Sequence, residues 1–250
     1  MINIIMHGCG GKMGRVVAEI VANDDACQIV AGIDPGIPQA DFPVFASPAE
    51  CSVKADVIID FSTATAVPAL LEFSKAKNIP IVVCTTALND ETMELLEETS
   101  KSVAVLKSAN MSIGVNLLLD LVQRAAQILY DANFDIEIVE KHHNQKIDAP
   151  SGTAMALADA MNEAMDQQFH YVYDRSQTSE KRERKEIGMH AVRGGNIVGD
   201  HDVIFAGRDE VIELTHRATS REVFAVGAVK AAKYLASQKA GLYSMKDVLA

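Results

Sequence analysis

The chain has 250 residues, 48% of them hydrophobic, which is enough to bury a sizeable core in one or two domains. Its 34 acidic and 23 basic residues give a formal net charge of −11, which argues against a generally basic surface for nucleic acid or anionic membranes. We therefore expect any anionic ligand to bind at a local cluster of positive charge.

The sequence also predicts a cytoplasmic protein with no membrane contact. No basic leader precedes the first apolar segment, and no apolar run approaches the ~20 residues that span a bilayer. The four cysteines lack C-x-x-C spacing, and a reducing compartment would leave them as thiols. We predict no metal site.

A strand, a glycine-rich turn and a helix open the chain. Residues 2–6 are apolar, residues 7–14 read His-Gly-Cys-Gly-Gly-Lys-Met-Gly, and residues 16–21 suit a helix. Glycines in this position allow a pyrophosphate to approach a helix N-terminus. The next strand, 28–33, ends at Asp34, where a carboxylate should accept hydrogen bonds from an adenosine ribose. This pattern predicts dinucleotide binding by Asp34 and by the turn residues Gly8, Cys9, Gly10, Gly11, Lys12, Met13 and Gly14.

Further strands and helices alternate up to residue 106. Strands are expected at 57–60, 81–84 and 103–106, and helices at 66–77 and 90–100, which predicts a parallel sheet. Ligands of such sheets bind beyond the carboxyl ends of the strands. We therefore expect the nicotinamide to lie near three loops, which are Phe61–Thr63, Thr85–Thr86 and Ser108, Ala109, Asn110 and Met111.

The pattern changes after a long apolar helix expected at 115–130. Strands rich in β-branched residues are expected at 134–139, 188–192, 197–205 and 211–216, followed by a helix at 223–235. This predicts an α+β second domain with an antiparallel or mixed sheet. The basic run 181–185 is interrupted by acid, and we interpret it as a solvated loop or helix end.

The segment 140–153, Glu-Lys-His-His-Asn-Gln-Lys-Ile-Asp-Ala-Pro-Ser-Gly-Thr, predicts a small-molecule site. It follows a half-buried strand, and a helix begins at Ser151–Thr153. Free N–H groups at a helix start bind anions, so Lys146, His143 and this turn can hold a carboxylate or phosphate together. The alternative is a polar loop with a Ser/Thr cap.

With both ends assembled, the chain resembles the 4-hydroxy-tetrahydrodipicolinate reductase family. The resemblance runs nearly end to end. Its motifs are Gly8–Gly14, Asp60-Phe61, Thr85-Thr86, Glu140–Thr153, Arg193–His201, Thr215-His216, Ser220-Arg221 and Gly241–Leu249. It implies an α/β fold in which residues 1–113 and 219–250 form a Rossmann-like dinucleotide-binding domain. Residues 114–218 would form the substrate-binding and tetramerisation domain, and the reaction would be the reduction of a cyclic imine dicarboxylate by NADH or NADPH.

The resemblance also implies roles for single residues. His142 would be the proton donor and acceptor, Lys146 a second proton donor, and His143 a substrate ligand. Adjacent side chains on an extended backbone point to opposite faces, which agrees with different roles for the two histidines. Glu140 either orients an imidazole or ends the strand, and we assign it no role. Substrate binding is expected from His143, Lys146, Ser151, Gly152 and Thr153.

The sequence departs from the usual family pattern at three places. The common Gly-Thr-Thr-Gly loop is Cys84-Thr-Thr-Ala87, the aromatic residue expected after Asn110 is Met111, and Pro35 replaces a basic residue after Asp34. Asp34 without a neighbouring cation favours NADH over NADPH, although Lys12 can partly offset the repulsion of a 2′-phosphate. Cys84 is included among the expected nicotinamide contacts.

Two other functions share parts of this pattern. A dehydrogenase of a different carbonyl or imine, such as an aspartate dehydrogenase, would share the first domain but lack the 140–153 segment. A non-catalytic NADH-binding redox sensor would need an effector module, and no part of the sequence resembles one.

Overall fold

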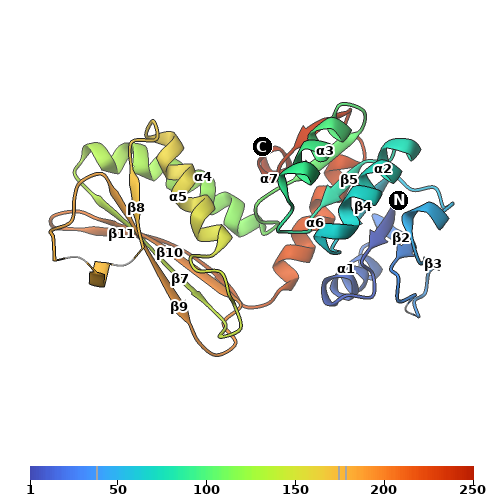
Figure 1. Ribbon diagram of the computed structural model, residues 1–250, viewed down its shortest axis with the longest axis horizontal. Helices are drawn as coiled ribbons and strands as arrows, with labels where there is room; N and C mark the ends of the chain where they lie inside the picture. The colour runs from blue at the N-terminus through green and yellow to red at the C-terminus, as the bar shows by residue number, and fades with distance from the viewer. Residues whose placement is uncertain (38, 174, 178) are drawn as a thin grey trace. The chain divides into compact units, whose positions relative to one another are not determined.

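The computed structural model describes residues 1–37, 39–173, 175–177 and 179–250. These residues form two compact units (Figure 1). The first consists of Met1–Ile113 and Glu222–Ala250, and the second of Gly114–Arg221. Both ends of the chain therefore belong to one unit.

The first unit is built on a parallel sheet. Seven strands of its described residues pair in the order β12-β6-β5-β4-β1-β2-β3. They are β1 (Ile2–His7), β2 (Cys27–Ile33), β3 (Val44–Phe45), β4 (Val57–Asp60), β5 (Ile81–Val83), β6 (Ala104–Lys107) and β12 (Gly241–Tyr243). The strand order reverses between β1 and β4, where ligands bind in sheets of this kind. The predicted Rossmann-like architecture is confirmed.

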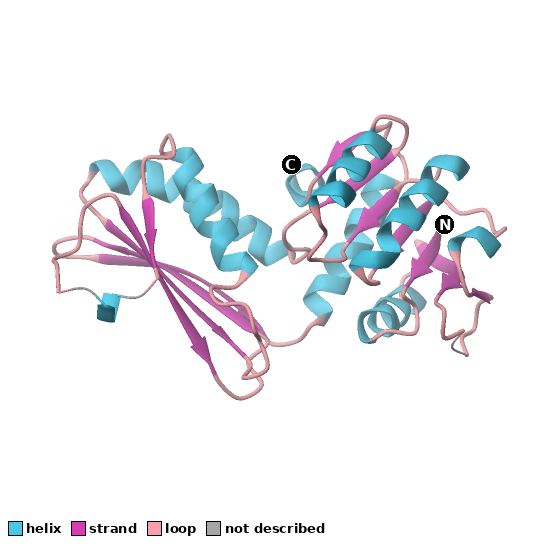
Figure 2. Cartoon of the chain, viewed as in Figure 1, coloured by secondary structure: helices cyan, strands magenta, loops and turns pink. Residues whose placement is uncertain are grey.

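Helices cover both faces of this sheet (Figure 2). They are α1 (Lys12–Ala22), α2 (Val67–Lys77), α3 (Asp90–Ser100), α6 (Glu222–Leu235) and α7 (Met245–Leu249), with short 3-10 turns at Pro48–Glu50 and Ala64–Ala66. In β1, Ile4 packs with the cluster that contains α1 and α6, whereas Ile5 packs with the cluster that contains α2 and α3. A strand buried on both faces needs apolar residues at consecutive positions, which explains the unbroken apolar run of β1.

Helix α6 holds the carboxyl-terminal segment against the first unit. A Cβ atom on Gly227 would lie 1.7 Å from the carbonyl oxygen of Met111, so this glycine allows the helix to approach the loop after β6. Ala225, Ala228, Ala231 and Ala232 of the same helix are fully buried. Small side chains thus set the close approach of α6.

The second unit contains a mixed sheet, which is one of the two arrangements predicted from the sequence. Its described strands pair in the order β11-β10-β7-β9-β8, with β10 antiparallel to its two neighbours and β9 parallel to β7 and β8. They are β7 (Asp135–His142), β8 (His170–Val172), β9 (Glu186–Arg193), β10 (Gly199–Ala206) and β11 (Val211–Ala218). The expected strand 134–139 therefore continues for three further residues, which places both Glu140 and His142 within the sheet.

Two long helices, α4 (Ile113–Asp131) and α5 (Gly152–Ala164), cover one face of this sheet (Figure 2). No α-helix among the described residues of the unit covers the other face, where a short 3-10 turn, Arg175–Gln177, is drawn. Ile136, Ile138 and Phe205 point toward the helices and are buried. The intervening residues of β7 and β10 are partly exposed. No helix among the described residues is long and apolar enough to cross a lipid bilayer.

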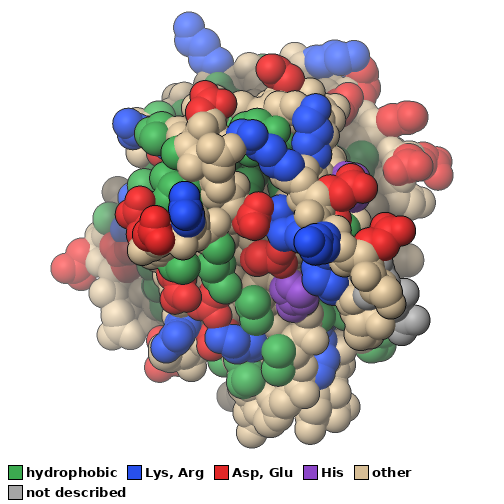
Figure 3. Space-filling model, turned by 90° about the vertical axis from the view of Figure 1, so that its left-hand side faces the viewer, with side chains coloured by type: hydrophobic (Ala, Val, Ile, Leu, Met, Phe, Trp, Pro, Cys, Tyr) green, Lys and Arg blue, Asp and Glu red, His purple; other side chains and the backbone are tan. Residues whose placement is uncertain are grey.

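Charge is mixed at the surface of the chain. On the face shown in Figure 3, lysine and arginine side chains lie among aspartate, glutamate and apolar side chains. The four cysteines are free and buried. Burial is the leading cause that raises the pKa of each of their thiols, so none of them is an activated thiolate.

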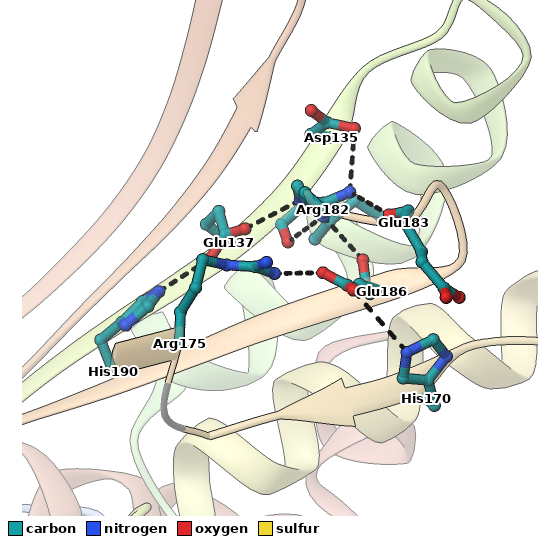
Figure 4. A network of polar contacts seen from close by, with 9 residues as sticks. Asp135, Glu137, His170, Arg175, Arg182, Glu183, Glu186 and His190 are labelled. Carbon is teal, nitrogen blue, oxygen red and sulfur yellow. Dashed lines mark hydrogen bonds and ion pairs between the residues drawn. The ribbon is translucent and has the colours of Figure 1, made fainter. Parts of the chain in front are cut away.

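The expectation that 181–185 is merely solvated is wrong for Arg182, whose side chain is only 17% exposed. Its guanidinium donates to the carboxylates of Asp135 and Glu137 and to the carbonyl oxygens of Ile136 and Glu186 (Figure 4). One cation therefore connects β7 to the start of β9. The sequence could not show this because the partners are carboxylates distant in the sequence or backbone carbonyl oxygens.

Candidate functional site

The glycine turn of the first unit is shaped by close backbone contacts. Gly8 has φ +78°, and a Cβ atom there would lie 2.4 Å from the carbonyl oxygen of Phe61. A Cβ on Gly14 would lie 2.3 Å from the carbonyl oxygen of Gly8. The N-cap of α1, Gly11, supplies no side-chain cap to the helix. The N–H groups at the start of α1 are thus left without that partner, as a phosphate-binding turn requires.

Asp34 lies beside this turn. Its Oδ2 accepts from the backbone N–H of Gly10 at 2.9 Å, and its Oδ1 accepts from Gly36 at 2.9 Å. The carboxylate is therefore hydrogen-bonded to the glycine turn, and its predicted role as a ribose ligand stays a prediction. Lys12 begins α1 and is exposed.

The loops after β4 and β5 are joined by hydrogen bonds. The Ser62 N–H donates to Thr85 Oγ1 at 3.0 Å, and Lys107 Nζ donates to the Thr85 carbonyl oxygen at 2.9 Å. Ala87 has φ +55°, a conformation that favours the glycine usual in the family. The substitution to alanine therefore leaves the backbone in the conformation that a glycine would adopt. Among the other candidates Cys84 and Met111 are buried, Ser108 and Asn110 are partly buried, and Thr86 and Ala109 are exposed.

A buried pair that the sequence reasoning missed lies at the same edge of the sheet. His7 Nδ1 and Asp60 Oδ1 are 2.8 Å apart, and both side chains are at most 5% exposed. They are register partners at the ends of β1 and β4. Burial lowers the pKa of nearby Lys107. The available signal was a polar residue closing each of two apolar strands.

The second unit holds the predicted proton-transfer histidine in a buried network. His142 Nδ1 lies 2.6 Å from Glu140 Oε2. Arg193, from β9, donates to both oxygens of Glu140 at 2.7 Å, and the Ser151 N–H donates to Oε1 at 3.0 Å. Glu140 is fully buried and His142 is 7% exposed. Arg193 belongs to one of the family motifs named above, but nothing in the sequence connects it with Glu140.

Opposing effects set the charges in this network. Burial alone would raise the pKa of Glu140, but the hydrogen bonds from Arg193 and His142 outweigh it and the pKa lies below its ordinary value. Burial lowers the pKa of His142, while Glu140 acts in the opposite direction. Glu140 is therefore an ionised carboxylate, and His142 is neutral in the free protein at neutral pH.

A second buried histidine, His201, lies next to His142. The two rings meet edge to face with centroids 5.2 Å apart, and His201 Nε2 lies 3.1 Å from Ser151 Oγ. Burial, with a smaller contribution from His142, lowers the pKa of His201 to about 4. Ser151 Oγ also accepts from the Ala154 N–H at the start of α5, so the residue is the helix cap. The hydroxyl of Ser151 is thus occupied by contacts within the protein.

Lys146 pairs with a carboxylate of its own loop. Its ammonium lies 2.8 Å from the carboxylate of Asp148. The pKa of Asp148 is lowered, chiefly by Lys146 and also by the backbone of Gly152 at the α5 N-terminus. Lys146 therefore holds a carboxylate shortly before the start of α5. Of the other candidates, His143 and Thr153 are partly exposed and Gly152 is exposed.

The described residues contain a group of potential metal ligands, formed by His170, Glu183 and Glu186 (Figure 4). Their ligand atoms lie within 4.8 Å of one another. Arg175 already pairs with the carboxylate of Glu186. The described part of the chain shows no other sign of an ion there. We propose no metal at this position.

The fold and these side chains define a class of protein, an oxidoreductase with a Rossmann-type domain for a nicotinamide cofactor. Family models described as "Dihydrodipicolinate reductase, N-terminus" and "Dihydrodipicolinate reductase, C-terminus" match residues 2–111 and 114–249. The chain therefore belongs to the dihydrodipicolinate reductase family. This confirms the resemblance predicted from the sequence.

Individual relatives agree along the whole chain. A 4-hydroxy-tetrahydrodipicolinate reductase of Caldanaerobacter subterraneus subsp. tengcongensis is 51% identical and one of Clostridium botulinum is 50% identical, each over 100% of this chain and 98% of the relative. The structure is similar to that of a dipicolinate-bound dihydrodipicolinate reductase from Paenisporosarcina sp. TG-14. That match has a TM-score of 0.79 and 26% identity and covers 98% of this chain and 97% of the other.

The low pKa of His201 predicts a specific pH dependence of stability. The unfolded chain binds a proton at this residue near pH 6.5, whereas the folded chain binds it only near pH 4. Stability from this group is therefore complete above about pH 6.5 and is lost as the pH falls toward 4. The parent chain should therefore lose about 2 kcal/mol of unfolding free energy through His201 when the pH falls from about 7.5 to 5. We expect this part of the loss to be absent in His201→Gln.

Urea denaturation at the two pH values measures this difference. His170→Gln is the matched control, because it removes a histidine whose side chain is 53% exposed and lies outside the buried network of His142 and His201. An equally steep loss of stability in His201→Gln and in the parent chain would contradict the prediction.

Proposed function

We propose that the chain reduces 4-hydroxy-tetrahydrodipicolinate to tetrahydrodipicolinate in the diaminopimelate route to lysine, with His142 as the proton donor and acceptor and Lys146 as a second proton donor. The observation that carries this proposal is the grouping of a buried imidazole, which is hydrogen-bonded to Glu140, with a lysine that already pairs with a carboxylate near a helix start. The names of the relatives that match the full chain support the same reaction.

The geometry fits both halves of the chemistry. When bound, NADH or NADPH supplies the hydride, and the residues proposed to hold it are the glycine turn, Asp34 and the loops after β5 and β6. The turn leaves no room for a Cβ at Gly8 or Gly14, and the start of α1 has no side-chain cap. These features support close approach of a pyrophosphate to the backbone.

The substrate is proposed to be a cyclic dicarboxylate. The related Paenisporosarcina structure is described as dipicolinate bound, and dipicolinate is a ring with two carboxylates. We propose that a substrate carboxylate replaces the Asp148 carboxylate at Lys146 and accepts hydrogen bonds from the N–H groups of Gly152 and Thr153. Ser151 would set the turn by capping α5, and His143 would contact the substrate from the loop. Charge-assisted hydrogen bonds of this kind contribute about 1.5–3 kcal/mol each.

The reaction itself is the first test. Purified chain is mixed with NADH and freshly made dihydrodipicolinate synthase product, and the loss of NADH absorbance is followed. Rapid loss that needs both substrate and enzyme supports the reductase. Loss only with oxaloacetate and ammonia would indicate an aspartate dehydrogenase, and NADH binding with no turnover on either substrate would indicate a sensor.

Removing either proposed proton donor should slow the chemical step. We expect His142→Gln and Lys146→Ala to lower kcat by about 10²–10⁴-fold, the contribution of one general acid or base. Affinity for NADH should stay nearly unchanged, because the cofactor candidates belong to the first unit. Steady-state kinetics and NADH titration by fluorescence measure the two quantities.

Lys141→Ala is the matched control for this pair of variants. Lys141 precedes His142 on β7, but its side chain pairs with Asp202 on the other face of the sheet. Its kcat should remain near that of the parent chain. Parent-like kcat in either His142→Gln or Lys146→Ala would remove that residue from the mechanism.

The cofactor preference is proposed to depend on Asp34. This carboxylate hydrogen-bonds a ribose 2′-hydroxyl but repels a 2′-phosphate, and exposed Pro35 offers no cation. Solvent screening leaves about 1–2 kcal/mol of the repulsion, so NADH should be favoured ~5–30-fold in kcat/KM with NADPH still usable. Asp34→Asn should shrink the preference, and Lys12→Ala should lower activity with NADPH further.

Asp25→Asn, at the opposite end of β2, is the control for charge alone and should keep the parent preference. The measurement is kcat/KM for both cofactors at low salt. Equal or better kcat/KM with NADPH in the parent chain would show that a cation outweighs Asp34.

We also propose a cytoplasmic homotetramer assembled through the open face of the second unit's sheet. Ile204 and Ala206 of β10 lie on this face and are partly exposed, and Val192 and Val211 are 45% and 57% exposed. A second copy of the chain would cover such a face. Light scattering should return four times the mass of one chain at micromolar concentration, and the mass of a single chain would contradict the assembly.

A further inference from the structure

We propose that Glu140 and Arg193 are a positioning pair that holds the proton of neutral His142 on Nδ1 and leaves Nε2 as the atom that exchanges a proton with the substrate. This inference rests on the proposed function of His142. It adds two residues to the machinery, neither of which contacts the reacting atoms in the proposed mechanism.

The first step of the argument is the hydrogen-bonding capacity of Glu140. Its carboxylate is fully buried and accepts four N–H bonds, with two donors on each oxygen. Oε1 accepts from the Ser151 N–H at 3.0 Å and from Arg193 Nη2 at 2.7 Å. Oε2 accepts from Arg193 Nη1 at 2.7 Å and from His142 Nδ1 at 2.6 Å. A buried carboxylate with a bidentate arginine stays ionised, and an ionised carboxylate can only accept.

The second step assigns the tautomer of His142. Because Oε2 cannot donate, the short contact to Nδ1 requires the hydrogen to be on Nδ1. In the neutral ring Nε2 then carries the lone pair, and in the protonated ring it carries the hydrogen that can be transferred. Within the described part of the chain Nε2 has no hydrogen-bond partner, and the side chain keeps 10% of its surface exposed.

Neighbouring residues keep the ring in this orientation. A Cβ atom on Gly199 would lie 3.0 Å from His142 Nε2, so glycine leaves space at that edge of the ring. His201 packs edge to face against the ring. Arg193 Nη2 also donates to the Asp148 carbonyl oxygen at 2.6 Å, which ties the pair to the loop that carries Lys146.

This network makes an unusual prediction for Glu140→Gln. The amide must place its NH₂ group at one of the two oxygen positions. At Oε1 it would face two donors, Ser151 and Arg193, whereas at Oε2 it would face one donor and His142 Nδ1. The second choice leaves only one N–H donor facing the NH₂ group and lets the amide donate to Nδ1. The hydrogen of His142 should therefore move to Nε2.

Nitrogen-15 NMR of histidine-labelled protein at neutral pH reads the tautomer directly, with the His142 signals assigned by their loss in His142→Gln. The parent chain should show His142 with its hydrogen on Nδ1, and Glu140→Gln should show it on Nε2. Turnover of Glu140→Gln should fall by about 10²-fold or more, because the wrong tautomer presents the wrong atom to the substrate. The limb of the kcat–pH profile that reports His142 should move to lower pH, since a negative charge that favours protonation is lost.

Glu137→Gln is the matched control. Glu137 lies on the same strand and pairs with Arg182 and His190 on the opposite face, so its loss tests the removal of a carboxylate from β7 without touching His142. It should leave the His142 tautomer and the pH profile unchanged. Arg193→Lys is a second variant, which keeps the positive charge but loses the two parallel N–H donors of the guanidinium. It should retain hydrogen on Nδ1 and lower kcat by about 10-fold.

The outcomes separate the positioning pair from the proposed reaction. Hydrogen on Nε2 in the parent chain, or a parent-like tautomer and kcat in Glu140→Gln, would overturn the inference. If Glu140→Gln does not fold, Arg193→Lys with parent-like kcat would overturn it as well. The expected tautomers in a chain that fails to reduce 4-hydroxy-tetrahydrodipicolinate would support the pair and refute only the proposed function.

Discussion

The second unit depends on one electrostatic constraint, the need to stabilise a carboxylate that is fully buried. An isolated ionised carboxylate in a protein interior is destabilised by several kcal/mol unless charge and hydrogen bonds compensate it. Here Arg193 supplies Glu140 with a positive charge and two hydrogen bonds. The backbone N–H of Ser151 and the imidazole of His142 supply one further hydrogen bond each. The donors come from β9, the start of α5 and β7 itself. Satisfying Glu140 therefore fixes three elements around the histidine.

The two units offer different groups to an anion. In the first, backbone N–H groups at the start of α1 are available because glycines at 8 and 14 allow a tight turn that side chains would block. In the second, the positive groups are side chains, Lys146 and Arg193, whose partners are carboxylates in this structure. Although the net charge of the chain is −11, groups that can bind an anion are thus grouped at the start of α1 and around Lys146 and Arg193.

Buried polar residues are the part of the structure that the sequence did not predict. The β7 strand was expected to end at Val139 because the apolar alternation ends there, yet Glu140 and His142 continue it as buried residues. Periodicity detects apolar side chains, and a buried polar side chain is compatible with a strand only when its partners are in place. Those partners, such as Arg193 at 53 residues' separation, come together only through strand pairing. The His7–Asp60 pair and the Arg182 network were missed for the same reason.

The sequence by itself determined the alternation of strands and helices, the glycine turn with Asp34, a second domain with its own sheet and the grouping of His142 with Lys146. These features are local, because they depend on residue periodicity, on glycine at a turn, or on a short segment whose residues stay close in any fold. Only the tertiary structure decided which atom of His142 carries the hydrogen, why Glu140 is ionised, and that His201 is kept neutral beside it. These properties depend on burial and on hydrogen bonds between distant strands, and neither is encoded within a few residues of the site.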